Sequence, residues 1–558
     1  MIFFDFEVFK QDWLVVFINP VEKKETVIVN DSNKLKEFYK ENKEKIFLGY
    51  NARSYDQYIF KAILCGFNPK EVSDFIIEKN KAGWMFSNLL NKIYLNFYDV
   101  MLNPSYSLKT LEGFMGHNIK ESSVPFNINR KLTANEIAEV IEYCRNDVKE
   151  TIDVFVKQKE DFLSHKSLIN MFNLHISNIK KTKAQLSAFI LGAKKIQRND
   201  EFNITILNNI QLNKYKHILN WYKDKSNMNY NKSLEVNVAG VPHIFGWGGL
   251  HGAIKNYREK GNFINVDVAS YYPSLMIEYD FQSRNIPNKE KFKNIYNQRL
   301  EYKKVKDKRQ QPLKIVLNST YGAMKDVYND LYDPLQANNV CINGQLFLLD
   351  LIEKLEPFCK IIQSNTDGIL IKVDGNENKV LSICKEWEDR TKMKLEYDKY
   401  TEVIQKDVNN YIIVDKDGNY KSKGAFVKKL NDLDYNLPIV NKAVVDYLIK
   451  GVKPETTINN CNELKEFQQI IKITSNYEYA VQGCKKLNEK TLRVFASISL
   501  TDYGVYKVKN GKQEKFADTP LNVFIVNENV NNMKCPIKLD RQYYINLANK
   551  RINQFLGK

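Results

Sequence analysis

Alternating apolar and polar positions at the start of the chain predict a strand over residues 2–9. Asp5 and Glu7 share one face of this strand, while Phe4, Phe6 and Val8 share the other. Two carboxylates therefore project together from a strand whose opposite face packs on a hydrophobic core.

Two later segments bring further acidic side chains to the ends of predicted elements. Residues 49–56 are typical of a strand end and turn, and Asp56 stands where a helical pattern begins. Residues 133–136 form a capping box, and Tyr143 and Asp147 lie one turn apart in the helix that it begins. Four carboxylates and a tyrosine suit two hard divalent cations that clamp a phosphodiester and activate water. This is the chemistry of a 3′-to-5′ exonuclease, and Asp99 is expected to have only a structural turn role.

A second acidic pair is predicted beyond residue 240. The alternation over residues 263–268 directs Asp267 away from the apolar face of a strand. Residues 361–371 read as two apolar strands joined by a tight turn, with Asp367 at the tip of the hairpin. Two carboxylates at strand ends are again candidates for holding metal ions.

Basic helices are predicted between these two carboxylates. Lys314, Asn318 and Tyr321 fall on one helical face, and Arg299 and Lys303 lie one turn apart in the preceding helix, with a break at residues 310–312. From residue 284 to 314 there are eleven Lys or Arg against three Asp or Glu. Such an excess suits a triphosphate, whose leaving pyrophosphate needs positive charge around it.

Composition agrees with a nucleic-acid partner. The 558 residues exceed what one hydrophobic core usually supports, so several domains are expected. Lys and Arg number 83 against 66 Asp and Glu, a net charge of +17 that favours polyanions. The eight cysteines show no Cys-x-x-Cys pair, and we find no long apolar run or export signal. The expectation is a reduced protein of the (bacterial) cytoplasm that does not enter a membrane.

These motifs, in this order, resemble those of family B DNA polymerases of the compact bacteriophage type with an N-terminal DEDD proofreading exonuclease. The matching segments are Asp5–Glu7, Asn51–Asp56 and Tyr143–Asp147 for the exonuclease, and Asp267–Ser274, Lys314–Gly322 and Asn365–Gly368 for polymerase motifs A, B and C. The resemblance implies template-directed addition of dNTPs to a primer by two-metal phosphoryl transfer. It also implies 3′-to-5′ proofreading in a DNA-replication enzyme, with two Mg²⁺ ions per active site and Mn²⁺ as a substitute.

The resemblance also implies roles for individual residues. The catalytic residues would be Asp267, Asp367, Asp5, Glu7, Asp56, Asp147 and Tyr143. The metal positions would be Asp267, Val268, Asp367, Asp5, Glu7 and Asp147. The nucleotide-binding residues would be Arg299, Lys303, Lys314, Asn318, Tyr272 as a steric gate against a 2′-hydroxyl, and Tyr321 as a monitor of the nascent base pair. The DNA-binding residues would be Asn51, Trp247, Gly248, Gly249, Lys406 and Tyr411.

The implied fold is multidomain, combining α/β and α+β parts: a ribonuclease-H-like exonuclease followed by a right-hand polymerase. The expected divisions are 1–165 for the exonuclease, 166–240 for a connecting helical segment, 241–284 for palm with motif A, 285–325 for fingers, 326–425 for palm with motif C, and 426–558 for a basic thumb that grips the duplex backbone.

The sequence departs from the family pattern at three places. Motif C lacks its first aspartate, because Asn365 stands there, and it ends in Gly368 rather than serine. The Tyr-x-Gly-Gly element is represented by residues 246–249, in which we expect the Trp247 indole to be available for stacking on template. In the duplex-binding Lys-x-Tyr element, Asn409 replaces the lysine, and Lys406 is the candidate substitute.

The spacing between the polymerase motifs is short. Only 47 positions separate Asp267 from Lys314 and 45 separate Gly322 from Asp367. There is no room for the insertions of protein-primed relatives, so we expect a phage or mobile-element replicase that extends ordinary primers. The expected partners are a DNA primer–template and dNTPs, with helicase and single-strand-binding protein as candidates and a monomeric state. The rivals are an exonuclease with a degenerate polymerase site and a non-catalytic nucleic-acid-binding protein.

Overall fold

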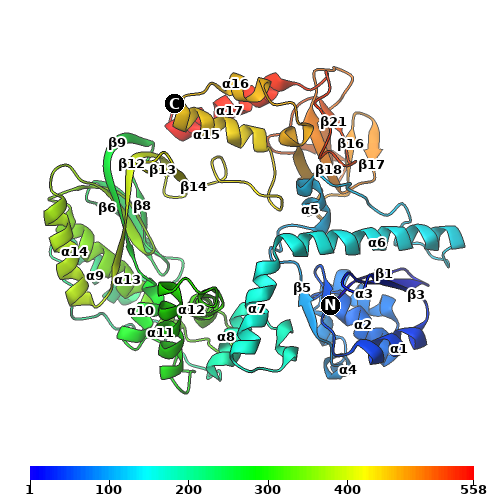
Figure 1. Cartoon of the computed structure of the whole chain (residues 1–558), viewed down its shortest axis with the longest axis horizontal. Helices are drawn as coiled ribbons and strands as arrows, with labels where there is room; N and C mark the ends of the chain where they lie inside the picture. The colour runs from blue at the N-terminus through cyan, green and yellow to red at the C-terminus, as the bar shows by residue number, and fades with distance from the viewer. The chain divides into compact units, whose positions relative to one another are not determined.

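The structure, a computed structural model, describes residues 1–558. The chain divides into two units (Figure 1). The first contains Met1–Lys180, Leu430–Val440 and Glu455–Asn546, and the second contains Lys181–Lys429, Asn441–Pro454 and Leu547–Lys558. No helix has both the length and the apolar character that crossing a membrane requires.

A five-stranded mixed sheet organises the N-terminal part of the first unit. Its strands are β1 (Ile2–Val8), β2 (Trp13–Asn19), β3 (Lys24–Val29), β4 (Phe47–Gly49) and β5 (Phe97–Asp99). The spatial order is β3-β2-β1-β4-β5, with β1, β2 and β3 antiparallel and β4 and β5 parallel to β1. A mixed sheet of this kind fits the α/β fold expected for this part of the chain. The strand order places β1, which carries the first acidic pair, in the centre of the sheet.

Helices cover both faces of this sheet (Figure 1). They are α1 (Ser32–Asn42), α2 (Asp56–Cys65), α3 (Pro69–Ile77), α4 (Asn88–Lys92), α5 (Leu108–Met115), α6 (Ala134–Lys157) and α7 (Lys159–Met171), with short 3₁₀ turns at Gly83–Met85 and Ile176–Lys180. Phe4 packs against Phe60 of α2, whereas Phe3 on the opposite face packs against Phe155 of α6. The capping box at Thr133 and Glu136 begins α6 as predicted.

The C-terminal part of the first unit consists of two small antiparallel sheets. Their strands are β15 (Gln469–Lys472), β18 (Thr491–Ala496) and β21 (Val523–Ile525) in one, and β16 (Tyr479–Gln482), β17 (Lys485–Leu487), β19 (Val505–Lys509) and β20 (Lys512–Lys515) in the other. A 3₁₀ turn covers Leu464–Phe467, and helices α15 (Pro438–Lys450), α16 (Pro454–Asn459) and α17 (Arg541–Leu556) extend across unit boundaries. The buried guanidinium of Arg493 donates to the carbonyls of Gly113 and His117. It thereby ties β18 to the segment that contains α5.

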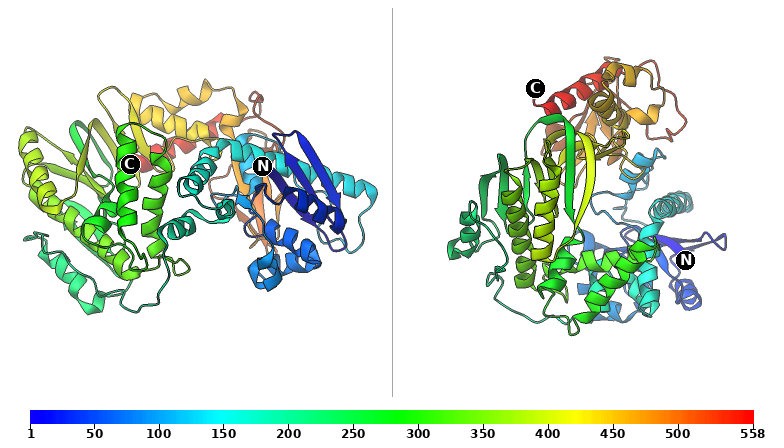
Figure 2. Two further views of the ribbon diagram at one scale, coloured as in Figure 1. Left: turned by 60° about the horizontal axis from the view of Figure 1, so that its bottom comes forward. Right: turned by 60° about the vertical axis from the view of Figure 1, so that its left-hand side comes forward.

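An antiparallel sheet of nine strands forms the centre of the second unit. Its long strands, with helices packed beside them, can be followed in Figure 2. Its strands are β6 (Ser233–Val238), β7 (Val241–Gly246), β8 (His251–Ala253), β9 (Tyr257–Val268), β10 (Lys360–Asn365), β11 (Gly368–Lys372), β12 (Leu395–Asp407), β13 (Asn410–Val414) and β14 (Tyr420–Lys423). The order is β14-β13-β12-β9-β11-β10-β8-β7-β6. Strand β9, which carries Asp267, and the β10–β11 hairpin, whose turn carries Asp367, are therefore neighbours. The expected combination of an α/β part and an α+β part is confirmed.

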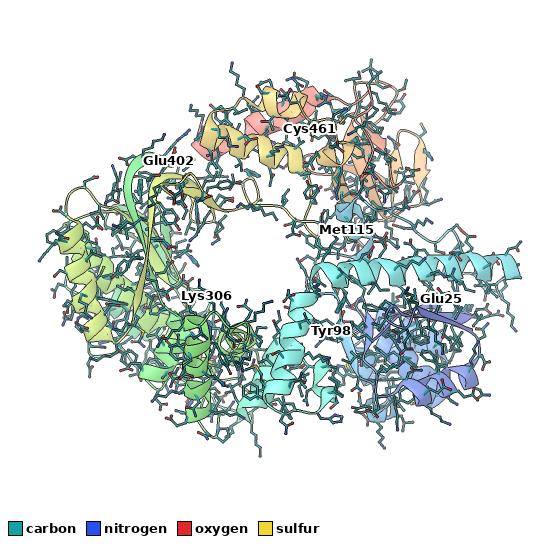
Figure 3. All side chains as sticks on the ribbon, in the orientation of Figure 1. Glu25, Tyr98, Met115, Lys306, Glu402 and Cys461 are labelled. Carbon is teal, nitrogen blue, oxygen red and sulfur yellow. The ribbon has the colours of Figure 1, made fainter.

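The helices of the second unit are α8 (Lys183–Leu191), α9 (Lys216–Lys223), α10 (Tyr271–Glu278), α11 (Glu290–Lys304), α12 (Gln310–Met324), α13 (Pro334–Leu355) and α14 (Glu377–Thr391), with a 3₁₀ turn at Lys225–Asn227. The helical hairpin of α11 and α12 was predicted, but its break was predicted wrongly. The chain turns at residues 305–309, around Lys306, which is labelled in Figure 3. Lys306 has φ of 55°. Pro312 lies inside the first turn of α12. Proline is tolerated there because the first amides of a helix need no acceptor within it.

Candidate active sites

The first unit gathers the five side chains predicted for exonuclease chemistry, here called the exonuclease-type site. Asp5 and Glu7 come from β1, Asp56 begins α2, and Tyr143 and Asp147 come from α6. The Phe6 amide donates to Asp56 Oδ1 at 3.3 Å, which holds this carboxylate against β1. The sheet thus brings together residues that are up to 142 positions apart in the sequence.

The carboxylates of the exonuclease-type site are buried among like charges. Burial raises the pKa of Asp5 and of Glu7 well above the usual range, and repulsion from the neighbouring carboxylates adds to the effect. Burial also raises the pKa of Asp56 to about 7. Crowded oxygen ligands that resist ionisation on their own fit hard divalent cations, which would relieve the repulsion.

A buried lysine that sequence reasoning missed enters this site from α5. Lys109 Nζ contacts Asp147 Oδ1 at 2.5 Å and Glu112 Oε1 at 2.9 Å, and it lies 4.7 Å from the centre of the Tyr143 ring. The Glu112 side chain is completely buried. The lysine therefore fixes both α6 residues of the site and neutralises part of their charge.

Two other residues of the first unit have local roles. Asn51 has φ of 60°, and its carbonyl accepts from the Ser54 amide in the turn before α2. Asp99 accepts from the backbone amides of Arg53 and Met101, both at 3.0 Å. Asp99 thus binds backbone turns, as expected of a structural residue.

The second unit brings Asp267 and Asp367 together in the polymerase-type site. In the register of β9 and β11, Asp267 lies opposite Gly368, and the Val268 amide donates to the Asp367 carbonyl at 2.7 Å. A Cβ on Gly368 would lie 2.0 Å from Asp267 Oδ1 and 2.9 Å from the Val266 carbonyl oxygen. The glycine that departs from the family pattern is therefore needed for the close approach of the two strands.

Asp267 in the polymerase-type site also lies in surroundings that oppose its ionisation. Burial raises the pKa of Asp267 to about 6, with smaller contributions from repulsion by Asp367 and Asp398. Asn265 Nδ2 donates to Asp267 Oδ2 at 2.6 Å and so orients the carboxylate. Two aspartates fixed on adjacent strands, with oxygen donors only, fit Mg²⁺ or Mn²⁺.

A cavity of about 560 Å³ opens on one side of these aspartates. Its basic wall consists of Arg299, Lys303 and Lys314, with Asn318 beside them. Arg299 is buried and donates to Ser270 Oγ at 2.8 Å, while its Nε has no partner. The exposed ammonium of Lys303 binds Glu396 at 2.8 Å. The structure thus places the predicted triphosphate-binding residues on the wall of one cavity.

Two tyrosines form an aromatic pair near this cavity. The rings of Tyr272 and Tyr321 lie 4.3 Å apart between centroids, and Tyr272 lines the cavity. Ser270, just before them, has φ of 49°, a left-handed conformation that is uncommon for serine. The turn into α10 therefore sets the position of the Tyr272 ring.

The glycine-rich segment packs directly on motif C. A Cβ on Gly249 would lie 2.4 Å from Thr366 Oγ1, whereas Gly248 has open space around it. The Trp247 indole is buried against Phe202 and Tyr230, and its Nε1 donates to the Asn227 carbonyl. The expectation of an indole free to stack on template is therefore not met, because the ring fills a core position.

The residues of the predicted duplex-binding element lie in different surroundings. Lys406 Nζ lies 5.6 Å from the centre of the Phe426 ring. Tyr411 instead lines a second cavity, of about 230 Å³, together with Asp267 and Asp367. At the position of the missing motif C aspartate, Asn365 Oδ1 is 3.3 Å from His251 Nδ1.

Comparison with known proteins gives curated relatives that share one name, two of which follow. The chain is 28% identical over 244 residues to DNA polymerase 1 of Saccharolobus solfataricus. The aligned region is 43% of this chain and 26% of that protein. It is 26% identical over 253 residues to DNA polymerase 1 of Sulfolobus acidocaldarius, and the aligned region is 44% of this chain and 27% of that protein. Together with the ordered motifs, they support a family B DNA polymerase. The chain spans about a quarter of the length of these relatives, and no family model matches it.

The structural comparison also includes a family B DNA polymerase. The structure of the enzyme from the hyperthermophilic archaeon Pyrobaculum calidifontis aligns with a TM-score of 0.43 at 13% identity. The alignment covers 99% of this chain and 77% of that chain.

The motifs of a family B DNA polymerase identify the carboxylates but not all the residues around them. Lys109 and Glu112 stand 38 and 35 positions before Asp147 on a different helix, and their stretch is typical of an ordinary amphipathic helix start. Lys421, which lines the second cavity, lies in a hairpin with abundant lysines. Nothing in the local pattern distinguishes these residues, because tertiary packing brings them to the sites.

Proposed function

We propose that the chain is a template-directed DNA polymerase that adds dNTPs to a primer 3′ end, with a 3′-to-5′ proofreading exonuclease. The observation that carries this proposal is that Asp267 at the end of β9 and Asp367 in the adjacent β10–β11 turn line one cavity together with Arg299, Lys303 and Lys314. Paired carboxylates beside a basic wall match a triphosphate whose α-phosphate reacts and whose pyrophosphate leaves.

The residues of the chain would divide this work. Arg299 and Lys314, which line the cavity, would neutralise the triphosphate. Tyr272 would close the sugar pocket against a 2′-hydroxyl, with Tyr321 behind it. Two bound Mg²⁺ ions, held by Asp267 and Asp367 with Val268 as a further oxygen donor, would supply the charge stabilisation that phosphoryl transfer needs.

The exonuclease is proposed from the first unit by the same reasoning. Asp5, Glu7, Asp56 and Asp147 supply only oxygen ligands and are crowded enough that burial and repulsion raise their pKa values. Tyr143, held beside Asp147, is placed to orient the attacking water or the scissile phosphate. Such a site would remove a mispaired nucleotide from the 3′ end of the primer.

A labelled-primer assay tests both parts of the proposal. A 5′-labelled primer annealed to a longer template is incubated with Mg²⁺, with and without the four dNTPs. Extension with dNTPs and shortening without them are expected. Shortening alone in both Mg²⁺ and Mn²⁺ would favour an exonuclease with a degenerate polymerase site, and deoxynucleotide attached covalently to protein would contradict extension of ordinary primers.

A further inference from the structure

Asp267 and Asp367 line two different cavities of the second unit. The cavity of about 560 Å³ contains the basic residues of α11 and α12. The cavity of about 230 Å³ is lined instead by β-strand residues, among them Gln363, Tyr411 and Lys421. The two carboxylates therefore form a shared boundary with a different chemical environment on each side.

The chemistry of phosphoryl transfer assigns different substrates to the two cavities. The attacking and leaving oxygens lie roughly in line on opposite sides of the reacting phosphorus. If the triphosphate occupies the larger cavity beside Arg299 and Lys314, its pyrophosphate leaves on that side. The attacking 3′-hydroxyl then approaches the phosphorus from the opposite side, and the smaller cavity, which shares Asp267 and Asp367 with the larger one, is the candidate place for the primer end.

Lys421 is the one cationic side chain among the residues that line the smaller cavity. It stands on β14, where it pairs with Ile413 of β13. Its ammonium binds Asp398 Oδ2 at 2.8 Å and lies 5.5 Å from the centre of the Tyr400 ring. The carboxylate and the ring together restrain a long side chain that would otherwise be free at the surface.

The lysine expected from the sequence, on β12, is less well placed. Lys406, the substitute expected from sequence, lies over Phe426 and does not line the cavity. Asn409, which replaces the lysine of the family pattern, carries no charge. A nucleic-acid strand that ends in the cavity nevertheless brings a phosphodiester with it, and that charge needs a partner.

We propose that Lys421 is a positioning residue that binds the terminal phosphodiester of the primer strand and so places the 3′-hydroxyl at Asp267 and Asp367. The proposal rests on the proposed polymerase function. It assigns to β14 the positive charge that the Lys-x-Tyr element lacks in this chain, while Tyr411 of β13 retains its place in the cavity wall.

The test compares Lys421→Gln with Lys399→Gln in the full chain. Lys399 is a matched control, because both lysine side chains are 65% exposed and each binds one carboxylate, but Lys399 does not line the cavity. Lys421→Gln should weaken binding of a primer–template by roughly tenfold and lower the slope of log affinity against log salt by about one. The KM for dNTPs should not change, and Lys421→Arg should restore binding.

A chemically modified primer locates the contact. A methylphosphonate, which is uncharged, replaces either the terminal linkage of the primer or one five linkages away. The terminal replacement should weaken binding by the wild-type chain but cause little further loss with Lys421→Gln, whereas the internal one should affect both proteins equally. The inference would be overturned if Lys421→Gln and Lys399→Gln bound primer–template equally well. It would also be overturned if the losses of affinity caused by Lys421→Gln and by the terminal methylphosphonate were additive.

Different results would contradict the proposed function and the proposed role of Lys421. A wild-type chain that binds primer–template but never extends it contradicts the proposed function. A wild-type chain that extends primers while Lys421→Gln binds them unchanged contradicts only the assignment of Lys421.

Discussion

The exonuclease-type site and the polymerase-type site both gather carboxylates, but they differ in burial and in the source of positive charge. In the first, Glu7, Asp56 and Asp147 are buried, and Lys109 of the same unit binds Asp147. In the second, Asp267 and Asp367 border two cavities, and the nearby cations lie on the cavity walls.

This difference follows from what each site must admit. A buried group of carboxylates is unstable without a counter-charge, so a fixed lysine lowers the cost of folding the empty site. A site for two substrates needs cations on its cavity walls that can meet phosphates, and there Lys303 and Lys421 each bind one exposed carboxylate rather than a buried one. The comparison therefore predicts that mutations in the first site affect stability as well as activity, whereas those in the second affect mainly activity.

The largest effect is expected from Gly368→Ala. Its Cβ would lie 2.0 Å from Asp267 Oδ1, so the carboxylate must move away from Asp367. A displacement of this size should lower primer extension by about 100-fold and leave digestion of the primer unchanged. Gly246→Ala, whose Cβ would have its nearest atom at 3.5 Å, is the control. Normal extension by Gly368→Ala in a gel assay would show that the carboxylate tolerates the methyl group.

The next effect is expected from Lys109→Met. Loss of the ammonium leaves Asp147 and Glu112 buried without their partner. We expect exonuclease activity to fall by about 30-fold, the free energy of unfolding to fall by about 3 kcal/mol, and extension to persist. Thermal melting and digestion of labelled single strands measure the two losses.

Lys61→Met is the matched control for this change. Lys61 is also buried, but it binds the Gln57 amide and no carboxylate. If Lys61→Met and Lys109→Met lose exonuclease activity to the same extent, the contact of Lys109 with Asp147 does not explain the loss.

A smaller effect is expected from Tyr272→Ala. Its ring lines the cavity of about 560 Å³ and lies against Tyr321, so its removal opens the sugar pocket. The preference for dNTPs over rNTPs, measured as the ratio of kcat/KM values, should fall by about tenfold. Tyr272→Phe keeps the ring and should keep the preference. An unchanged ratio in Tyr272→Ala would remove this residue from the specificity pocket.

The smallest effect is expected from Cys144→Ala. Cys144 Sγ donates to the Asp5 carbonyl at 3.3 Å and lies 3.8 Å from Asp5 Oδ2. This weak bond adds little to a backbone already held by the sheet, so exonuclease activity should fall by only about twofold. A loss as large as that of Lys109→Met would mean that the thiol contributes directly to the site.

Much of the acidic framework could be predicted from the sequence because it is encoded locally. The alternation around Asp5, the capping box before Tyr143 and the turn at Asp367 are each set by neighbouring residues, and the structure has them as expected. The polymerase relatives support the function that these motifs suggest.

The features that could not be predicted depend on contacts between residues that are distant in the sequence. The helix break was predicted at residues 310–312 because proline usually ends a helix, but Pro312 lies in the first turn of α12. The environment of Trp247 is set by Phe202 and Tyr230, whose proximity no local pattern shows. Lys109 likewise reaches its partners only through the packing of α5 on α6.

The central claim is that one chain contains two separate catalytic sites. Its most direct test is a reciprocal comparison of Asp367→Ala and Asp5→Ala on the same 5′-labelled primer–template, with extension and shortening quantified in parallel reactions with Mg²⁺. We predict that Asp367→Ala shortens the primer but does not extend it, and that Asp5→Ala extends the primer but does not shorten it. Loss of both activities in either variant, with folding intact, would contradict the account.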